Sequence, residues 1–166
     1  MPTMFPVSHN SDPNDPNRRI DYWQPGDGIP GTAKTAFVLL LISSIGLLYS
    51  GVMMWVIERP VVDDAEQMAH INTVSTNMKW VGTVQIAGAL LIALLLPALL
   101  KGDGKRRRWL MVVISITMVF TVLAWVMGIG GLEHALIALV MALAALAMYR
   151  PTVRTFFGGS PGELER

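Results

Sequence analysis

Four long apolar stretches, nearly free of charged side chains, restrict what this sequence can fold into. They cover residues 35–57, 80–100, 109–129 and 132–149. The first contains 23 residues, and a helix of that length spans about 34 Å, enough to cross the ~30 Å hydrocarbon core of a bilayer. The whole chain is 52% apolar and 15% charged, which is typical of a membrane protein. The sequence therefore predicts an all-α, integral membrane four-helix bundle.

The remaining length and the missing residue types exclude several classes of function. The chain has 166 residues and uses most of them to cross the bilayer, so a large catalytic domain does not fit. It has no cysteine, which excludes disulfides, thiolate nucleophiles and cysteine-ligated metal centres. None of His9, His70 and His134 lies deep within a stretch, so a haem with two histidine ligands is not expected. We predict no catalytic, cofactor-binding or metal-ligating residues.

The chain divides into three segments, and the apolar stretches all lie in the middle one. Residues 1–33 hold six of the ten prolines among Asn, Asp, Ser and Gly. This composition buries too little apolar surface to fold, so a disordered N-terminal tail is expected. Residues 34–150 are expected to form the four-span transmembrane domain, and residues 151–166 a C-terminal tail.

The distribution of basic residues predicts the orientation of the chain. Eleven of the 13 Lys and Arg residues lie before residue 35, in the connection at 101–108, or after the last stretch. Such residues are retained in the cytoplasm, so both termini are expected on the cytoplasmic side of the cell membrane. Trp55, Trp80 and Trp125 fall at the opposite ends of the stretches, where aromatic rings prefer the membrane interface.

The connections between the stretches differ in length. The glycine-rich segment 128–131 is so short that the third and fourth stretches must form an antiparallel hairpin. The connection before the second stretch carries Asp63, Asp64 and Glu66 as the start of a helix would, facing the positive end of its dipole. Residues 63–78 are therefore expected to be helical, either on the membrane surface or as an extension of the second stretch.

Small residues recur at spacings of three and four on two of the stretches. Such stripes let helices approach closely, which favours association in lipid. They form either a docking face for another membrane subunit or a packing surface within the bundle. The stripes comprise Ala135, Ala138, Ala142 and Ala145 on the fourth stretch, and Ser43, Gly46 and Ser50 on the first.

Two ionisable residues, Glu133 and His134, lie at the start of the fourth stretch. Ionisable groups inside a membrane are candidates for proton handling. A carboxylate in the first turn of a helix also meets the favourable end of the helix dipole and can reach water. An interfacial cap is therefore the competing interpretation.

A basic cluster of Lys105, Arg106, Arg107 and Arg108 lies between the second and third stretches. Because membrane helices flank it, the cluster is expected to fix the topology and to contact anionic lipid headgroups, and no nucleic acid partner is expected. The preceding Gly104 lacks the glycine spacing of a phosphate-binding loop, which excludes nucleotide binding of that kind.

The layout of the whole chain resembles a known class of proteins. The proline-rich tail, Pro30-Gly31-Thr32-Ala33, the acidic connection and Tyr149-Arg150-Pro151 are similar to those of small uncharacterised four-helix membrane proteins of actinobacteria. The resemblance implies a non-catalytic accessory or assembly subunit of a larger cell-envelope complex, of respiratory or lipid-transport type. Other integral membrane subunits would then be its partners. A small oligomeric transporter or channel is the alternative.

Overall fold

The computed structural model describes residues 23–24, 26–58 and 60–158. Most of the predicted disordered tail, residues 1–22, and the last residues of the predicted C-terminal tail, 159–166, lie outside the described residues. The described residues form five helices: α1 (Gly31–Val56), α2 (Ala65–Leu100), α3 (Gly104–Val126), α4 (Leu132–Tyr149) and α5 (Pro151–Phe156).

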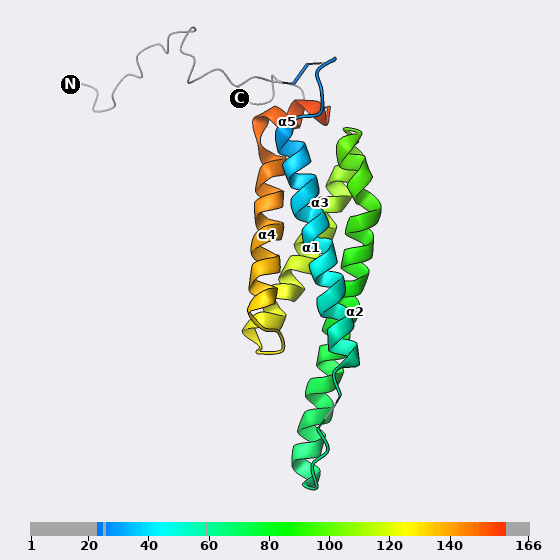
Figure 1. The fold of residues 1–166 in the computed structure, drawn as a ribbon, viewed down its shortest axis with the longest axis vertical. Coiled ribbons are helices and arrows are strands. Elements are labelled where there is room, and N and C mark those ends of the chain that lie inside the picture. Colours follow the sequence, from blue (N-terminus) through cyan, green and yellow to red (C-terminus); the bar gives the residue numbers. More distant parts are fainter. Residues whose placement is uncertain (1–22, 25, 59, 159–166) are drawn as a thin grey trace, which may run out of the picture.

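The four long helices pack as an antiparallel bundle (Figure 1). Each contacts two neighbours: α1 lies beside α2 and α4, and α3 lies beside the same two helices. The short helix α5 lies across the end of the bundle at which α1 begins and α4 ends. We call this the α5 end, and the opposite end, where residues 127–131 connect α3 to α4, the hairpin end.

Each of the helices α1 to α4 is long and apolar enough to cross a membrane, and they are the candidate spans found among the described residues. Leu40, Leu47 and Ile92 are fully buried between the helices, whereas Leu136 and Leu139 are exposed on the outside of the bundle. Apolar side chains on both the inside and the outside suit a bundle that is surrounded by lipid. The chain is a multi-pass membrane protein, which confirms the predicted all-α, four-helix fold class.

Helix α1 begins earlier than expected. Residues 31–33 were predicted to belong to the disordered tail, but they form the first turn of this helix. Pro30 precedes them with a φ of −54°, and a proline at a helix start loses no hydrogen bond because its missing N–H would have had no helical partner. Ala33 and Ala36 are fully buried, so packing against the bundle holds this turn. The predicted tail is therefore too long at its C-terminal end.

Helix α2 decides between the two alternatives for residues 63–78. It is one continuous helix of 36 residues from Ala65 to Leu100, about 54 Å long. Asp64 caps its start, because its side chain accepts a hydrogen bond of 2.9 Å from the backbone N–H of Glu66. Residues 65–78 project beyond the hairpin end of the bundle (Figure 1), and we call them the α2 extension. They extend the second span and do not form a separate surface helix.

Helix α3 begins at Gly104 and not at Trp109. The Asp103 side chain caps this start. It accepts hydrogen bonds from the backbone N–H groups of Lys105, at 3.0 Å, and Arg106, at 3.2 Å. The basic cluster is therefore helical and not a loop. At the other end of α3, Gly128 has a positive φ of 70°, which lets the chain reverse into α4 and confirms the predicted hairpin.

Candidate functional site at the hairpin end

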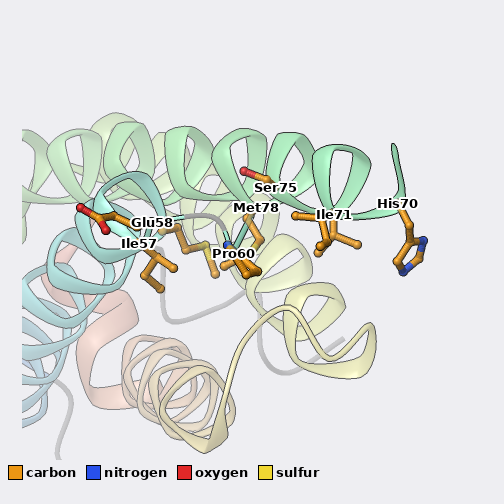
Figure 2. A pocket seen from close by; sticks show the side chains of 9 residues that line it. Ile57, Glu58, Pro60, His70, Ile71, Ser75 and Met78 are labelled. Atoms are coloured by element: carbon orange, nitrogen blue, oxygen red, sulfur yellow. The ribbon is translucent and has the colours of Figure 1, made fainter. Parts of the chain in front are cut away.

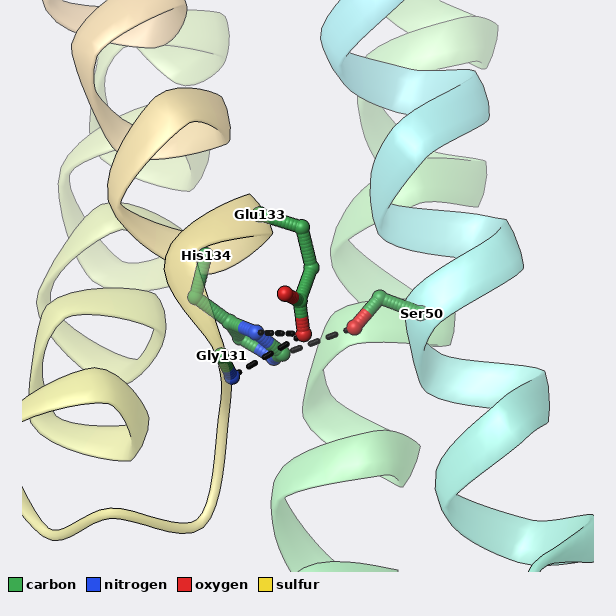
Figure 3. A network of polar contacts seen from close by, with 4 residues as sticks. All are labelled: Ser50, Gly131, Glu133 and His134. Atoms are coloured by element: carbon green, nitrogen blue, oxygen red, sulfur yellow. Dashed lines mark hydrogen bonds and ion pairs between the residues drawn. The ribbon is translucent and has the colours of Figure 1, made fainter.

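A buried polar network joins α1 to the start of α4 near the hairpin end (Figure 3). His134 lies in the first turn of α4 but is only 2% exposed, because α1 runs past this turn as far as Val56. Gly130 makes room for the imidazole ring, since a Cβ at that position would collide with it. Ser50 on α1 is 5% exposed and faces the ring.

Hydrogen bonds on both sides of the imidazole ring hold this network together. Ser50 Oγ lies 3.0 Å from His134 Nε2, and His134 Nδ1 lies 3.0 Å from Glu133 Oε1. The same carboxylate oxygen accepts a hydrogen bond of 3.0 Å from the backbone N–H of Gly131. The Glu133 side chain is 58% exposed, so the network runs from the protein surface to a buried hydroxyl group.

The carboxylate fixes the direction of these hydrogen bonds. An ionised carboxylate only accepts, so we assign the ring proton of a neutral His134 to Nδ1. Nε2 is then an acceptor, and the Ser50 hydroxyl donates to it. This arrangement can carry a proton between Glu133 and Ser50, and it can also act as a structural link between α1 and α4. Among the described residues, no three His, Cys, Asp or Glu side chains are grouped as they would be around a metal ion.

The structure separates the roles of Glu133 and His134. Glu133 accepts the Gly131 N–H and so supports the start of α4, in the position that an interfacial cap would take. His134 faces the interior of the bundle and bonds to Ser50. This burial was not predicted, because it depends on how far α1 extends past the start of α4. Proton handling by either residue stays a prediction.

The small-residue stripes fall partly inside the bundle. Ser43 is buried and its hydroxyl donates 2.9 Å to the carbonyl of Leu39 in its own helix. Gly46 faces α4, since a Cβ there would lie 3.2 Å from the side chain of Ile137. On α4 one alanine of the stripe, Ala138, is buried, and the half-buried members are Ala135, Ala142 and Ala145. Contact of these stripes with a partner subunit stays a prediction.

The basic cluster divides between the interior and the surface. Arg107 is half-buried, and its guanidinium donates 2.7 Å to the carbonyl of Met148 and lies 4.9 Å from the centre of the Phe157 ring. It therefore connects the start of α3 to the end of α4 and to the residue after α5. The exposed members of the cluster, which face the surroundings of the bundle, are Lys105, Arg106 and Arg108.

A groove lies between the α2 extension on one side and the last turn of α1 with the segment that follows it on the other (Figure 2). Its volume is about 330 Å³. Val74 in this groove is 37% exposed. Most of the lining is apolar and comes from both sides, including Met54, Ile57 and Pro60 on one side and Ile71, Val74 and Met78 on the other. The projecting part of α2 therefore presents apolar surface beyond the bundle.

Comparisons with known proteins assign no role to these sites. No protein-family model matches the sequence, and no curated protein or solved structure is significantly similar to it. The four long apolar helices are consistent with a small four-helix membrane protein. The chain is thus identified by its architecture, as a multi-pass membrane protein, and not by a family.

Proposed function

We propose that the chain is a non-catalytic accessory or assembly subunit of a larger cell-envelope complex, of respiratory or lipid-transport type. The α2 extension is the proposed docking element. Its proposed partner is another integral membrane subunit that has a part outside the membrane. The observation that carries this proposal is the apolar groove along the extension.

The properties of the groove support a docking role. Ile71 and Val74 line the groove, and Val74 is 37% exposed; apolar surface in contact with water is unfavourable by about 25 cal/mol per Å². Exposed apolar patches of this kind mark interaction sites. A partner subunit is the proposed occupant of the groove.

The distribution of charge supports an outer location for the extension. Lys34, Lys101 and the basic cluster lie at the α5 end of the bundle, whereas Asp63 and Asp64 lie at the tip of the extension. Lys and Arg residues near span ends favour the cytoplasmic side. We therefore assign the α5 end to the cytoplasm and the docking element to the outer face of the cell membrane.

Photocrosslinking from the groove tests the accessory role. A photoreactive amino acid at Val74 should crosslink to one defined membrane protein in native membranes. The same amino acid at Thr73, which is exposed and does not line the groove, should not. Val74→Glu should abolish recovery of that protein after gentle detergent extraction, because a carboxylate is unfavourable in an apolar contact. Thr73→Glu should preserve it.

The stability of both variants separates partner loss from unfolding. Position 74 lies outside the packed core, so Val74→Glu and Thr73→Glu should unfold at the same temperature as the parent protein. A Val74→Glu protein that keeps its partner would contradict the proposal. Crosslinks from Val74 that reach only lipid, or only a second copy of the chain, would contradict it too.

A small oligomeric transporter or channel is the second candidate function, and one observation favours it. Each long helix buries at least one polar side chain inside the bundle. These residues include Ser50 on α1, Gln85 on α2, Thr121 on α3 and His134 on α4. If the purified protein alone moves a solute or an ion across liposome membranes, this function is established and the accessory role is rejected.

A further inference from the structure

The side chain of Gln85 on α2 is fully buried, but neither end of its amide is paired. It is 0% exposed, and within the described part of the chain neither Oε1 nor Nε2 has a hydrogen-bond partner. Buried polar groups in proteins are nearly always paired, because an unpaired amide in an apolar surrounding is costly. Gln85 therefore points to a further hydrogen-bond partner inside the bundle.

The crossing of α1 and α2 places Gln85 close in height to Ser50. Gly82 contacts Gly51, since a Cβ on either glycine would lie 2.8 Å from the carbonyl oxygen of the other. Gln85 follows Gly82 by three residues, and Ser50 precedes Gly51 on the antiparallel helix. The two side chains therefore lie within about one helical turn of each other along the bundle.

A second helix contact places Gln85 at the height of Thr121 on α3. A Cβ at Gly88 would collide with the side chain of Thr117. Gln85 lies three residues before Gly88, and Thr121 lies four residues after Thr117 on the antiparallel helix. Both side chains are 0% exposed. Because Ser50 also bonds to His134 on α4, all four long helices contribute a buried polar group at this height.

We propose that Ser50, Gln85, Thr121 and His134 form a polar layer that holds one or more internal water molecules. Water suits this layer because the Gln85 amide offers both donors and an acceptor, and one water molecule can serve both kinds of group. All four side chains are at most 5% exposed, so the water is enclosed by the bundle. This proposal does not depend on the accessory role.

The hydrogen-bond directions in the candidate site agree with this layer. The Ser50 hydroxyl uses its proton for His134 Nε2, so its oxygen remains an acceptor towards the layer. A water molecule that donates to Ser50 Oγ can accept a hydrogen bond from Gln85 Nε2. The network that begins at the exposed Glu133 carboxylate then continues to Gln85, which lies about 8 Å beyond Trp80 along α2.

Water-edited solid-state NMR of the full chain in lipid bilayers tests the proposal. Magnetisation that starts on water should reach the side-chain amide of Gln85 and the ring of His134. Gln67 is exposed on the α2 extension and gives the signal of a hydrated amide, whereas the fully buried Leu47 gives the signal of a dry interior. A Gln85 signal as low as that of Leu47 would overturn the proposal.

A substitution provides a second measurement. Gln85→Met removes both polar groups and keeps an unbranched side chain. We expect the chemical shift of His134 Nε2 to change, its water signal to fall, and the melting temperature to stay equal or decrease. Gln67→Met is the matched control and should change none of these.

A raised melting temperature with an unchanged His134 shift would mean that the amide is unpaired in a dry core, and would overturn the proposal. The measurement on the parent protein decides the matter if the variant does not fold.

Discussion

Gly51 and Gly82 lie against each other where α1 crosses α2. A Cβ on either glycine would lie 2.8 Å from the carbonyl oxygen of the other, and backbone atoms cannot turn aside as a flexible side chain can. In lipid the hydrophobic effect does not drive helices together, so close van der Waals contact of this kind must contribute to their association. The crossing lies next to Ser50 and therefore helps to position the candidate site.

We expect Gly51→Ala to destabilise the bundle. The added methyl group would lie 2.8 Å from Gly82 O and 2.8 Å from the side chain of Ile86, and overpacking typically costs about 1–3 kcal/mol. Alanine has a higher helix propensity than glycine, which stabilises the variant by about 0.5–1 kcal/mol. The packing loss is larger, so we expect a net decrease in stability. Thermal unfolding in mild detergent measures the net change.

Gly31→Ala is the matched control for this substitution. Nothing lies within 4 Å of a Cβ at position 31, so the melting temperature should stay equal or rise slightly. If Gly51→Ala and Gly31→Ala melted at the same temperature, the crossing would have no special role in stability.

A double-mutant cycle should detect the hydrogen bond between Ser50 and His134. For Ser50→Ala, His134→Leu and the double variant we expect a coupling energy of about 0.6 kcal/mol, the average for such bonds in membranes, and at most about 1.7 kcal/mol. Each single variant leaves its partner unpaired in the bundle, so the single losses should exceed the coupling. Reversible unfolding in bicelles gives the free energies. Ser115→Ala, which removes an exposed hydroxyl, is the control. Strictly additive losses would show that the bond contributes nothing.

Arg107→Gln is expected to loosen α5 from the bundle, because Arg107 donates to Met148 O and lies over the Phe157 ring. The expected results are a lower melting temperature and faster proteolysis at the C-terminal segment. Arg108→Gln, at an exposed position of the same helix, should show neither effect. Equal proteolysis rates for the two variants would contradict the role of Arg107 as a link between α3 and α5.

The exposed basic residues should determine the preference for anionic lipid. Replacing Lys105, Arg106 and Arg108 together by Gln is expected to weaken anionic lipid retention by about 1 kcal/mol per charge, with little loss of stability because these side chains are exposed. Native mass spectrometry from nanodiscs with anionic or zwitterionic lipid can compare the two proteins. Unchanged lipid retention would argue against headgroup contact by this cluster.

Reporter fusions can determine the orientation of the bundle. A fusion after residue 158 should report a cytoplasmic location, and a fusion within the segment 60–64 should report an external one, because basic residues gather at the α5 end. The two segments lie at opposite ends of the molecule (Figure 1). A C-terminus found outside the cell would reject the predicted topology.

Features that depend on the local sequence could be predicted, whereas features that depend on contacts between distant residues could not. The four helices could be predicted because length and apolar composition are local properties, and Asp63, Asp64 and Glu66 indicated the helix start that the structure places at Ala65. The turn at Gly128 follows in the same way from local glycine content. The start of α1 was missed because burial of Ala33 against other helices outweighs the tail-like composition before it.

Features of the candidate site depend on residues far apart in the chain. The burial of His134 requires α1 to lie beside it, and no periodicity within α4 indicates that. Arg107 points inward because it contacts Met148 and Phe157, which are distant in the sequence. The sequence analysis therefore assigned the same lipid contact to all four residues of the basic cluster. Gln85 is fully buried without a hydrogen-bond partner among the described residues, and this depends on how α2 packs against its neighbours and not on the local sequence.

Because α2 is one continuous helix, it can tilt as a rigid rod, and a movement of one end then moves the other. If it pivots at Gly82, where it touches Gly51, the arm that reaches Ala65 is about 25 Å long and the arm that reaches Gln85 is about 4.5 Å long. Sideways displacement of the tip is then transmitted to Gln85 in the opposite direction and reduced about sixfold. A tip displacement of about 3 Å would thus move Gln85 by about 0.5 Å, enough to change a hydrogen-bond length.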